Sequence, residues 1–339
     1  MFRRILTAIL AVCLFYVPPI ASANSSHGAH SANQPLKVAM LIPGNTKDGG
    51  FMEAGYQGLV KLEKEMAVKT TYIDGIKPDL QELSNALRTL AQDNPNLIIA
   101  HGGQCSQATK VVAAEFPHIQ FAVIQGNVKG DNLSSYEILQ EESAWLAGAA
   151  AGLMTKTGVV GHISGIRVVP GLKGRAAFAD GVRYTNPSAK LLTTFAGNQD
   201  DNALSKKVAQ AQINAGADII FTMLNAGRMG AIEACKESNV YQIGNVRDWT
   251  KVQPDVFVAS AIANVSIAAF EAGRDMAQGT WQAGQIKKIG LSNRDAVSLA
   301  LAPYVPQAVA EQIEQLAQKI AKGEIHVATT YEGPEFSIE

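Results

Sequence analysis

Two aspartates are the residues best placed for chemistry. Asp48 and Asp248 each follow an apolar stretch that is typical of a buried strand. Paired carboxylates could do acid–base work, or they could accept hydrogen bonds from the N–H and hydroxyl groups of a bound ligand. The alternative for each is helix capping or an ion pair within its own loop. For Asp200 and Asp201, at the start of a predicted helix, the capping role is the stronger expectation.

Aromatic residues make up only 6% of the chain, so their positions are informative. Phe51 begins a predicted helix close to Asp48, and Trp249 follows Asp248 directly. An aromatic ring on each side of a cleft could hold a flat ligand between them. A core or surface role is the alternative for Trp249. The pair Gly49-Gly50 opens the same helix as Phe51, where backbone amides could receive a polar ligand group or simply form a tight turn.

The other reactive side chains do not form a catalytic set. His101 follows a predicted strand and Cys105 follows it in the next helix, but this spacing does not establish the hydrogen-bond reach that a nucleophile and its base need. We expect His101 to be a polar residue of a cleft or a loop. The sequence has neither a Gly-x-Ser-x-Gly elbow nor a phosphate loop. It therefore predicts no enzyme, no catalytic residue and no cofactor, and His27 and His30 are not expected to bind a metal.

The N-terminus predicts export. Residues 1–23 contain a basic head, an apolar middle and a small-residue end, which together are typical of a secretory signal peptide cleaved after Ala23. The apolar middle is shorter than the roughly 20 residues of a membrane-spanning helix. Cys13 follows Val12 rather than a small residue, so a lipid anchor is not expected. Residues 24–36 are small and polar and predict a disordered leader.

Composition limits the partners of the protein. The full sequence of 339 residues carries a formal net charge of −1, and no basic cluster is present that would attract nucleic acid. Hydrophobic residues amount to 47%, enough for a large buried core. Cys105 and Cys235 lie in apolar-rich helical segments. A disulfide between them is an alternative in an oxidising compartment, but we expect two buried free thiols.

From residue 37 onward, short apolar segments alternate with amphipathic ones. The first series predicts strands at 37–43, 68–74, 96–102 and 119–126, and helices at 51–66, 78–93 and 105–115. The second predicts strands at 158–164, 189–197, 217–223, 241–246 and 256–262, and helices at 143–157, 170–185, 204–215, 227–237 and 265–278. Short strands at 286–291 and 296–301, a helix at 306–322 and a strand-like tail complete the prediction.

This alternation indicates parallel sheets covered by helices on both faces. Because the chain is too long for one comfortable core, we predict an α/β protein with two doubly wound parallel-sheet lobes joined by a hinge. The N-terminal lobe is expected to span 37–140 plus about 263–296, and the C-terminal lobe 141–262 plus about 297–339. Ligands of open parallel sheets bind beyond the carboxyl ends of the strands, which selects the loops that contain the aspartates.

Several stretches, in order, resemble one known family. They are KVAMLIPGNTKDGGFMEAGYQGL, FPHIQFAVIQG, ESAWLAGAAAGLMTKTGVVGHISG, AAFADGVRYTNP, AGADIIF and IGNVRDW. Together they resemble the basic membrane protein family of ABC-transporter substrate-binding proteins, which includes bacterial purine nucleoside receptors. The resemblance implies a type I periplasmic binding protein fold that encloses a purine nucleoside or a related base between two lobes. It also implies a membrane permease as partner.

The resemblance can be carried over to single residues. Asp48 and Phe51 match the family's aspartate and base-stacking phenylalanine, Asp248 matches an acidic loop residue, and Gly227 matches a glycine that approaches the ligand. The departures are Met52 for an asparagine, Gln125 for an aspartate, Gln199 for an aromatic residue, Trp249 for a glutamine, and Ala263 or Asn264 for a lysine that faces the sugar. Trp249 could replace the missing aromatic platform, so a free nucleobase or another flat polar heterocycle competes with a nucleoside.

The sequence therefore predicts a monomeric periplasmic solute receptor of an ABC importer. The alternatives are a receptor of the same fold for a sugar or a signal molecule, and an exported nucleoside hydrolase. The predicted ligand-binding residues are Asp48, Phe51, Met52, His101, Gln125, Gln199, Gly227, Asp248 and Trp249.

Overall fold

The computed structural model describes residues 35–338. The predicted signal peptide, Cys13 and residues 24–34 of the predicted leader lie outside the described residues. Within them the chain forms two six-stranded sheets with helices between the strands, which confirms the predicted α/β class and its two sheets. None of the helices in this part of the chain is long and apolar enough to cross a membrane.

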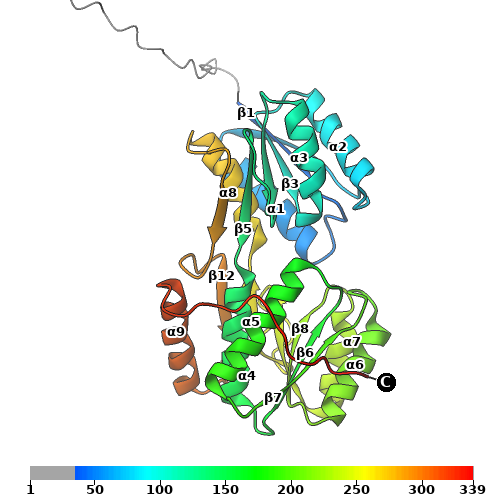
Figure 1. The fold of residues 1–339 in the computed structure, drawn as a ribbon, viewed down its shortest axis with the longest axis vertical. Helices are drawn as coiled ribbons and strands as arrows, with labels where there is room; N and C mark the ends of the chain where they lie inside the picture. The colour runs from blue at the N-terminus through cyan, green and yellow to red at the C-terminus, as the bar shows by residue number, and fades with distance from the viewer. Residues whose placement is uncertain (1–34, 339) are drawn as a thin grey trace, which may run out of the picture. The chain divides into compact units, whose positions relative to one another are not determined.

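The first lobe contains an all-parallel sheet in the order β11-β5-β4-β3-β1-β2. Its helices are α1, α2, α3 and α8, which accompany this sheet in Figure 1. The strands are β1 (Leu36–Leu41), β2 (Val68–Ile73), β3 (Leu97–His101), β4 (Gln120–Ile124), β5 (Leu133–Ile138) and β11 (Ile286–Ile289). The helices are α1 (Phe51–Glu65), α2 (Leu80–Gln92), η1 (Gly103–Cys105), α3 (Ser106–Glu115) and α8 (Val265–Ala277).

Alternate side chains of these strands point to opposite faces, as the pleat of a strand requires. Met40 of β1 packs in the same cluster as Leu59 of α1, whereas Leu41 packs in the cluster that contains Leu87 of α2. The first sheet is therefore apolar on both faces. This explains why β1, β3 and β4 read as nearly continuous hydrophobic runs in the sequence.

The second lobe has the sheet order β12-β10-β9-β8-β6-β7 with helices α4–α7 and α9 (Figure 1). All pairs are parallel except β10 with β12, so the edge strand β12 departs from the predicted parallel sheet. The strands are β6 (Val159–Ser164), β7 (Lys190–Phe195), β8 (Ile219–Met223), β9 (Tyr241–Val246), β10 (Phe257–Ala263) and β12 (Val297–Leu301). The helices are α4 (Gln140–Met154), α5 (Val169–Thr185), α6 (Asn202–Asn214), α7 (Arg228–Ser238) and α9 (Gln307–Ala321).

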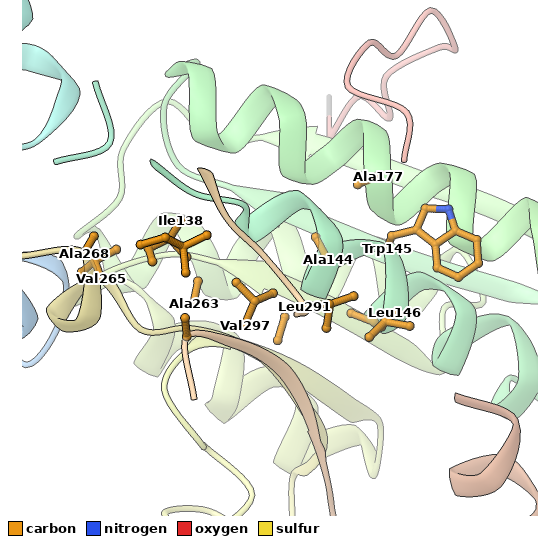
Figure 2. Packing of buried hydrophobic residues seen from close by; sticks show 14 of the residues in the cluster. Ile138, Ala144, Trp145, Leu146, Ala177, Ala263, Val265, Ala268, Leu291 and Val297 are labelled. Carbon is orange, nitrogen blue, oxygen red and sulfur yellow. The ribbon is translucent and has the colours of Figure 1, made fainter. Parts of the chain in front are cut away.

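The chain passes between the two sheets after β5, after β10 and after β11. Buried apolar residues gather at these crossings, and Figure 2 shows Ile138, Ala263, Val265 and Val297 in one packed group. Ile138 ends β5, Ala263 ends β10, and Val297 begins β12. The crossings therefore share one apolar cluster, which extends to Trp145 of α4 in the second lobe.

Two further elements differ from the prediction. Strand β5 was not expected, because its sequence LSSYEI contains two serines and a glutamate within a short stretch. The strand-like tail is not a strand. Instead, Phe336 donates its backbone N–H to the Thr193 carbonyl at 2.7 Å, and Glu335 forms ion pairs with Arg167 and Arg175. The tail is thus held to β7 by hydrogen bonds, to Arg167 and Arg175 by ion pairs, and to the apolar cluster of the second lobe by Phe336 and Ile338.

Candidate functional site

Two adjoining cavities lie between the loops of the two sheets. The larger has a volume of about 580 Å³, and its wall includes Glu53 of α1, Asp248 and Asn264. The smaller has a volume of about 140 Å³. Both share Gly49, Gly50, Val246 and Arg247. These residues follow β1 or end and follow β9, so the cavities lie where ligands of open parallel sheets are expected.

The two predicted aromatic residues come together at the smaller cavity. Phe51 from the start of α1 and Trp249 from the loop after β9 both form part of its wall. Asp48 lies in the same wall, on the Phe51 side. Because the two rings belong to different lobes, a flat molecule in this cavity would contact an aromatic side chain from each.

His101 lies behind Phe51 rather than in the wall of either of these cavities. Its ring stacks on the Phe51 ring with centroids 4.2 Å apart, and its Nε2 donates a hydrogen bond to the Phe51 carbonyl at 2.8 Å. Gly55, one turn further along α1, makes this possible, since a Cβ there would lie 2.5 Å from His101 Cε1. His101 therefore positions Phe51 and covers one face of its ring.

The environment of His101 and Cys105 does not suit nucleophilic catalysis. Burial lowers the pKa of His101 to about 4 and raises the pKa of Cys105 to about 12. The Cys105 thiol donates to the His101 backbone carbonyl at 3.7 Å, not to the imidazole. The predicted free thiols are confirmed, because Cys105 and Cys235 are both buried and unbridged.

Two buried histidines make the protein sensitive to acid. Burial lowers the pKa of His101 to about 4 and that of His162, which bonds Thr193 and Ser164, to about 3. The pKa of a histidine in the unfolded chain is about 6.5. At a pH below this value but above the native pKa, the histidine is protonated in the unfolded chain and neutral in the native state. The free energy of unfolding therefore falls as the pH falls. We expect each histidine to cost about 1.4 kcal/mol of unfolding free energy between about pH 7.5 and about pH 5.5.

Urea unfolding at the two pH values measures this loss. Carboxylates titrate in the same range, so the informative quantity is the difference between the wild type and His162→Gln. The variant should lose less stability on acidification, by about 1.4 kcal/mol. An unchanged pH dependence in His162→Gln would show that His162 is protonated in the native state.

Asp48 forms its hydrogen bonds with residues close to it in the sequence. Asp48 accepts hydrogen bonds from the backbone N–H groups of Gly50, Met52 and Glu53 at 2.8, 3.1 and 3.0 Å, so it caps the start of α1. The N–H of Gly49 is bonded to Glu53 at 2.8 Å, and the glycine amides are therefore used within their own loop. This matches the capping alternative, and it leaves Asp48 in the cavity wall as an acceptor.

Asp248 lies in the wall of the larger cavity. It accepts a hydrogen bond from the Thr250 N–H at 3.1 Å and pairs with Lys251 at 3.1 Å. Partial burial alone would raise its pKa, but the hydrogen bonds from Thr250 and Lys251 outweigh burial and hold the pKa below its usual range. Asp248 is therefore ionised, which suits an acceptor and not a general acid.

Trp249 is fixed on several sides. Its indole Nε1 donates to the Asn245 carbonyl at 3.1 Å, and its backbone N–H donates to Ser260 Oγ at 2.9 Å. The guanidinium carbons of Arg228 and Arg247 lie 4.4 and 4.2 Å from the ring centroid. The ring is half-buried and its orientation is set before any ligand arrives.

Besides His101, four of the predicted residues line neither of these two cavities: Met52, Gln125, Gln199 and Gly227. The Met52 side chain packs over Gly44, and the Gln125 side chain bonds both backbone polar groups of Ile138, with Nε2 donating to its carbonyl at 3.1 Å. The Gln199 carbonyl accepts from the N–H of Gly227 at 3.1 Å. A Cβ at Gly227 would lie 2.8 Å from that oxygen, so this glycine permits the close approach of two loops.

Sequence reasoning missed Arg228 and Arg247, which both contribute to the smaller cavity. Each follows a predicted strand by a few residues, as the chosen aspartates do, so their position alone could have marked them. Arginine side chains are mostly exposed, so the sequence alone does not mark these two as cavity residues. Only the structure shows that Arg228 is 4% exposed.

Comparisons with known proteins place the chain in a family. Residues 36–330 match the Bmp family model, described as ABC transporter substrate-binding protein PnrA-like. Basic membrane protein A2 of Borrelia garinii subsp. bavariensis is 26% identical over 337 residues, covering 96% of each chain. The transcriptional activator protein med of Bacillus subtilis is 27% identical over 248 residues, covering 73% of this chain and 77% of that protein.

Solved structures share the fold. An ABC transporter solute-binding protein from Aeropyrum pernix K1 superposes with a TM-score of 0.74 at 20% identity, covering 88% of this chain and 94% of that one. A transcriptional activator of the comK gene from Bacillus halodurans gives a TM-score of 0.74 at 21% identity, covering 85% and 98%. The resemblance inferred from the sequence is confirmed: the chain belongs to the Bmp family of PnrA-like ABC transporter substrate-binding proteins.

Proposed function

We propose that this chain is the periplasmic receptor of an ABC importer and that it captures a purine-type nucleobase or nucleoside between its two lobes. Family membership supports a substrate-binding role with a small-molecule ligand and a membrane permease as partners. The single observation that carries the choice of ligand is the presence of Phe51 and Trp249 in the wall of one cavity. Stacking of a base on an aromatic side chain contributes about 1–3 kcal/mol.

Both rings are held in place without a ligand. Phe51 is stacked on His101, and Trp249 is bonded to Asn245 and Ser260. Binding therefore orders few side chains, and more of the stacking free energy remains for affinity. The rigid pair favours a flat ring over a flexible or globular solute.

The larger cavity suits a second, polar part of the ligand. Its wall includes Asn264, Ser266 and Ser298 near the crossings between the sheets, and Asp248 after β9. Amide, hydroxyl and carboxylate groups can bond sugar hydroxyls without the lysine that the family uses. A nucleoside would occupy both cavities, and a free base only the smaller one.

The hydrogen bonds of the polar residues also support a binding role. Asp48 is engaged by backbone amides, Asp248 by Thr250 and Lys251, and His101 by Phe51. None of these three is arranged to activate water against a glycosidic bond. Closure of the two lobes around the ligand would exclude water and present a new surface to the permease.

The test is to identify what the protein carries. The chain is purified without denaturation, and small molecules released on unfolding are analysed by mass spectrometry. A thermal-shift panel of nucleobases, nucleosides and sugars follows. We expect an intact base or nucleoside, and a Tm that rises with the logarithm of its concentration. Stabilisation by sugars alone would favour the sugar receptor, and recovery of a base together with free ribose would favour the hydrolase.

A further inference from the structure

Arg228 is a buried cation whose hydrogen-bonding groups are only partly used. It is the first residue of α7 and is 4% exposed. Its Nη2 donates to the Leu224 carbonyl and to Asn245 Oδ1. Its Nε and Nη1 are buried without a hydrogen-bond partner within residues 35–338. Buried donors are normally satisfied, so each unsatisfied donor requires an explanation.

The charge of Arg228 is also unbalanced. No carboxylate of the described part of the chain pairs with Arg228 or Arg247 within 4.0 Å, and the nearby Asp248 is paired with Lys251. Burial, and to a smaller extent the charge of Arg247, lowers the pKa of Arg228 to about 9. A buried charge without a partner is costly, and an incoming anion would remove that cost.

The position of the two arginines connects them with the ligand. Both form part of the wall of the smaller cavity, and both lie over the Trp249 ring, at 4.4 and 4.2 Å. The one carboxylate in the same wall is Asp48, and three backbone N–H groups of its own loop and α1 already bond it. The smaller cavity therefore presents two cations to a ligand that stacks on Phe51, on the side of the cavity where Trp249 lies.

We propose that Arg228, together with Arg247, forms an anion subsite in the smaller cavity, and that the natural ligand is a flat heterocycle that is negatively charged at neutral pH. An acidic purine or a pyrimidine carboxylate has this chemistry. The inference rests on the proposed capture of a flat ring and narrows its chemical class. Guanidinium groups suit this task because they stay charged and bond carboxylate and ring oxygens strongly.

Matched pairs of probes test the subsite by titration calorimetry. Urate is compared with hypoxanthine and orotate with uracil, so that the members of each pair share a ring system and only the first is an anion at neutral pH. Succinate serves as an anion without a ring. We expect the anionic heterocycle of a pair to bind on the order of 10- to 100-fold more tightly, as charge-assisted hydrogen bonds would give. The preference should fall as the salt concentration rises.

Two variants assign the effect to the residue. Arg228→Met should abolish the preference for the anion, whereas Arg183→Met, at a position on α5 whose side chain is 75% exposed, should retain it. Arg228→Met is expected to fold, because it keeps much of the apolar volume of the side chain and removes the desolvation cost of a buried charge without a carboxylate partner. If Arg228→Met does not fold, the subsite is tested with Arg247→Met and with the salt dependence of the wild type. Arg247→Met should then reduce the preference for the anionic heterocycle.

The outcomes separate this inference from the proposed function. Equal binding of charged and neutral heterocycles, or a preference that survives in Arg228→Met, overturns the anion subsite and leaves the capture of a flat ring intact. Binding of succinate alone, lost in Arg228→Met, supports the subsite but overturns the flat ligand. Failure of every probe to bind overturns both.

Discussion

Replacing Phe51 by alanine weakens binding of the cleft ligand roughly 5- to 150-fold, the range that corresponds to one lost base–aromatic stacking contact. The ring lies in the wall of the smaller cavity and is supported from behind by His101 at 4.2 Å. A ligand stacked on the free face loses that contact when the side chain is truncated. Titration calorimetry with the base or nucleoside that stabilises the wild type most strongly measures the change.

Two variants separate stacking from stability. Phe51→Leu retains apolar volume but not the ring, so it should bind almost as weakly as Phe51→Ala while unfolding at a higher temperature. Phe116→Ala removes a ring at the end of α3 that packs against the first-lobe core and lines neither cavity. It should lower Tm without changing the dissociation constant. Wild-type affinity in Phe51→Ala would mean that the ligand does not stack on this ring.

Most of the fold could be predicted because strands such as β1, β3 and β4 are nearly continuous apolar runs and helices such as α2 and α9 are amphipathic. Strand β5 could not, because the partners that stabilise it are remote in the sequence. Ser134 donates its hydroxyl to the Gln282 carbonyl, 148 residues away, and the backbone N–H of Ser135 donates to the Gln285 carbonyl. Buried hydroxyls are tolerated when they are bonded, but such partners cannot be seen in a local pattern.

The sequence predicted where the candidate site lies better than it predicted which side chains face the cavity. Phe51 and Trp249 follow strands whose carboxyl ends meet at the cleft, so their position could be inferred. The Gln125 side chain was expected to face the ligand, yet its amide bonds the backbone of Ile138 at a crossing between the sheets. Which of several polar loop residues faces the cavity depends on tertiary neighbours that one sequence does not reveal.

The packing of α4 against α5 gives the prediction with the largest effect on stability. A Cβ at Gly181 would lie 2.0 Å from the Trp145 carbonyl oxygen and 2.8 Å from the Ala149 nitrogen. On the facing helix, a Cβ at Gly148 would lie 2.1 Å from the Phe178 carbonyl oxygen. The two helices therefore approach backbone to backbone, and Trp145, one of the large buried side chains of the second lobe, depends on that approach.

Gly181→Ala should lower the free energy of unfolding by about 3 kcal/mol, because backbone atoms rather than flexible side chains must move. Gly171→Ala is the matched control on the same helix, since its Cβ would meet only ordinary contacts at 3.5 Å or more. That change should be neutral or stabilising by up to about 1 kcal/mol, because alanine favours the helix. Urea unfolding of both variants measures the two effects, and equal changes in Gly181→Ala and Gly171→Ala would show that the close approach of α4 and α5 does not require glycine at position 181.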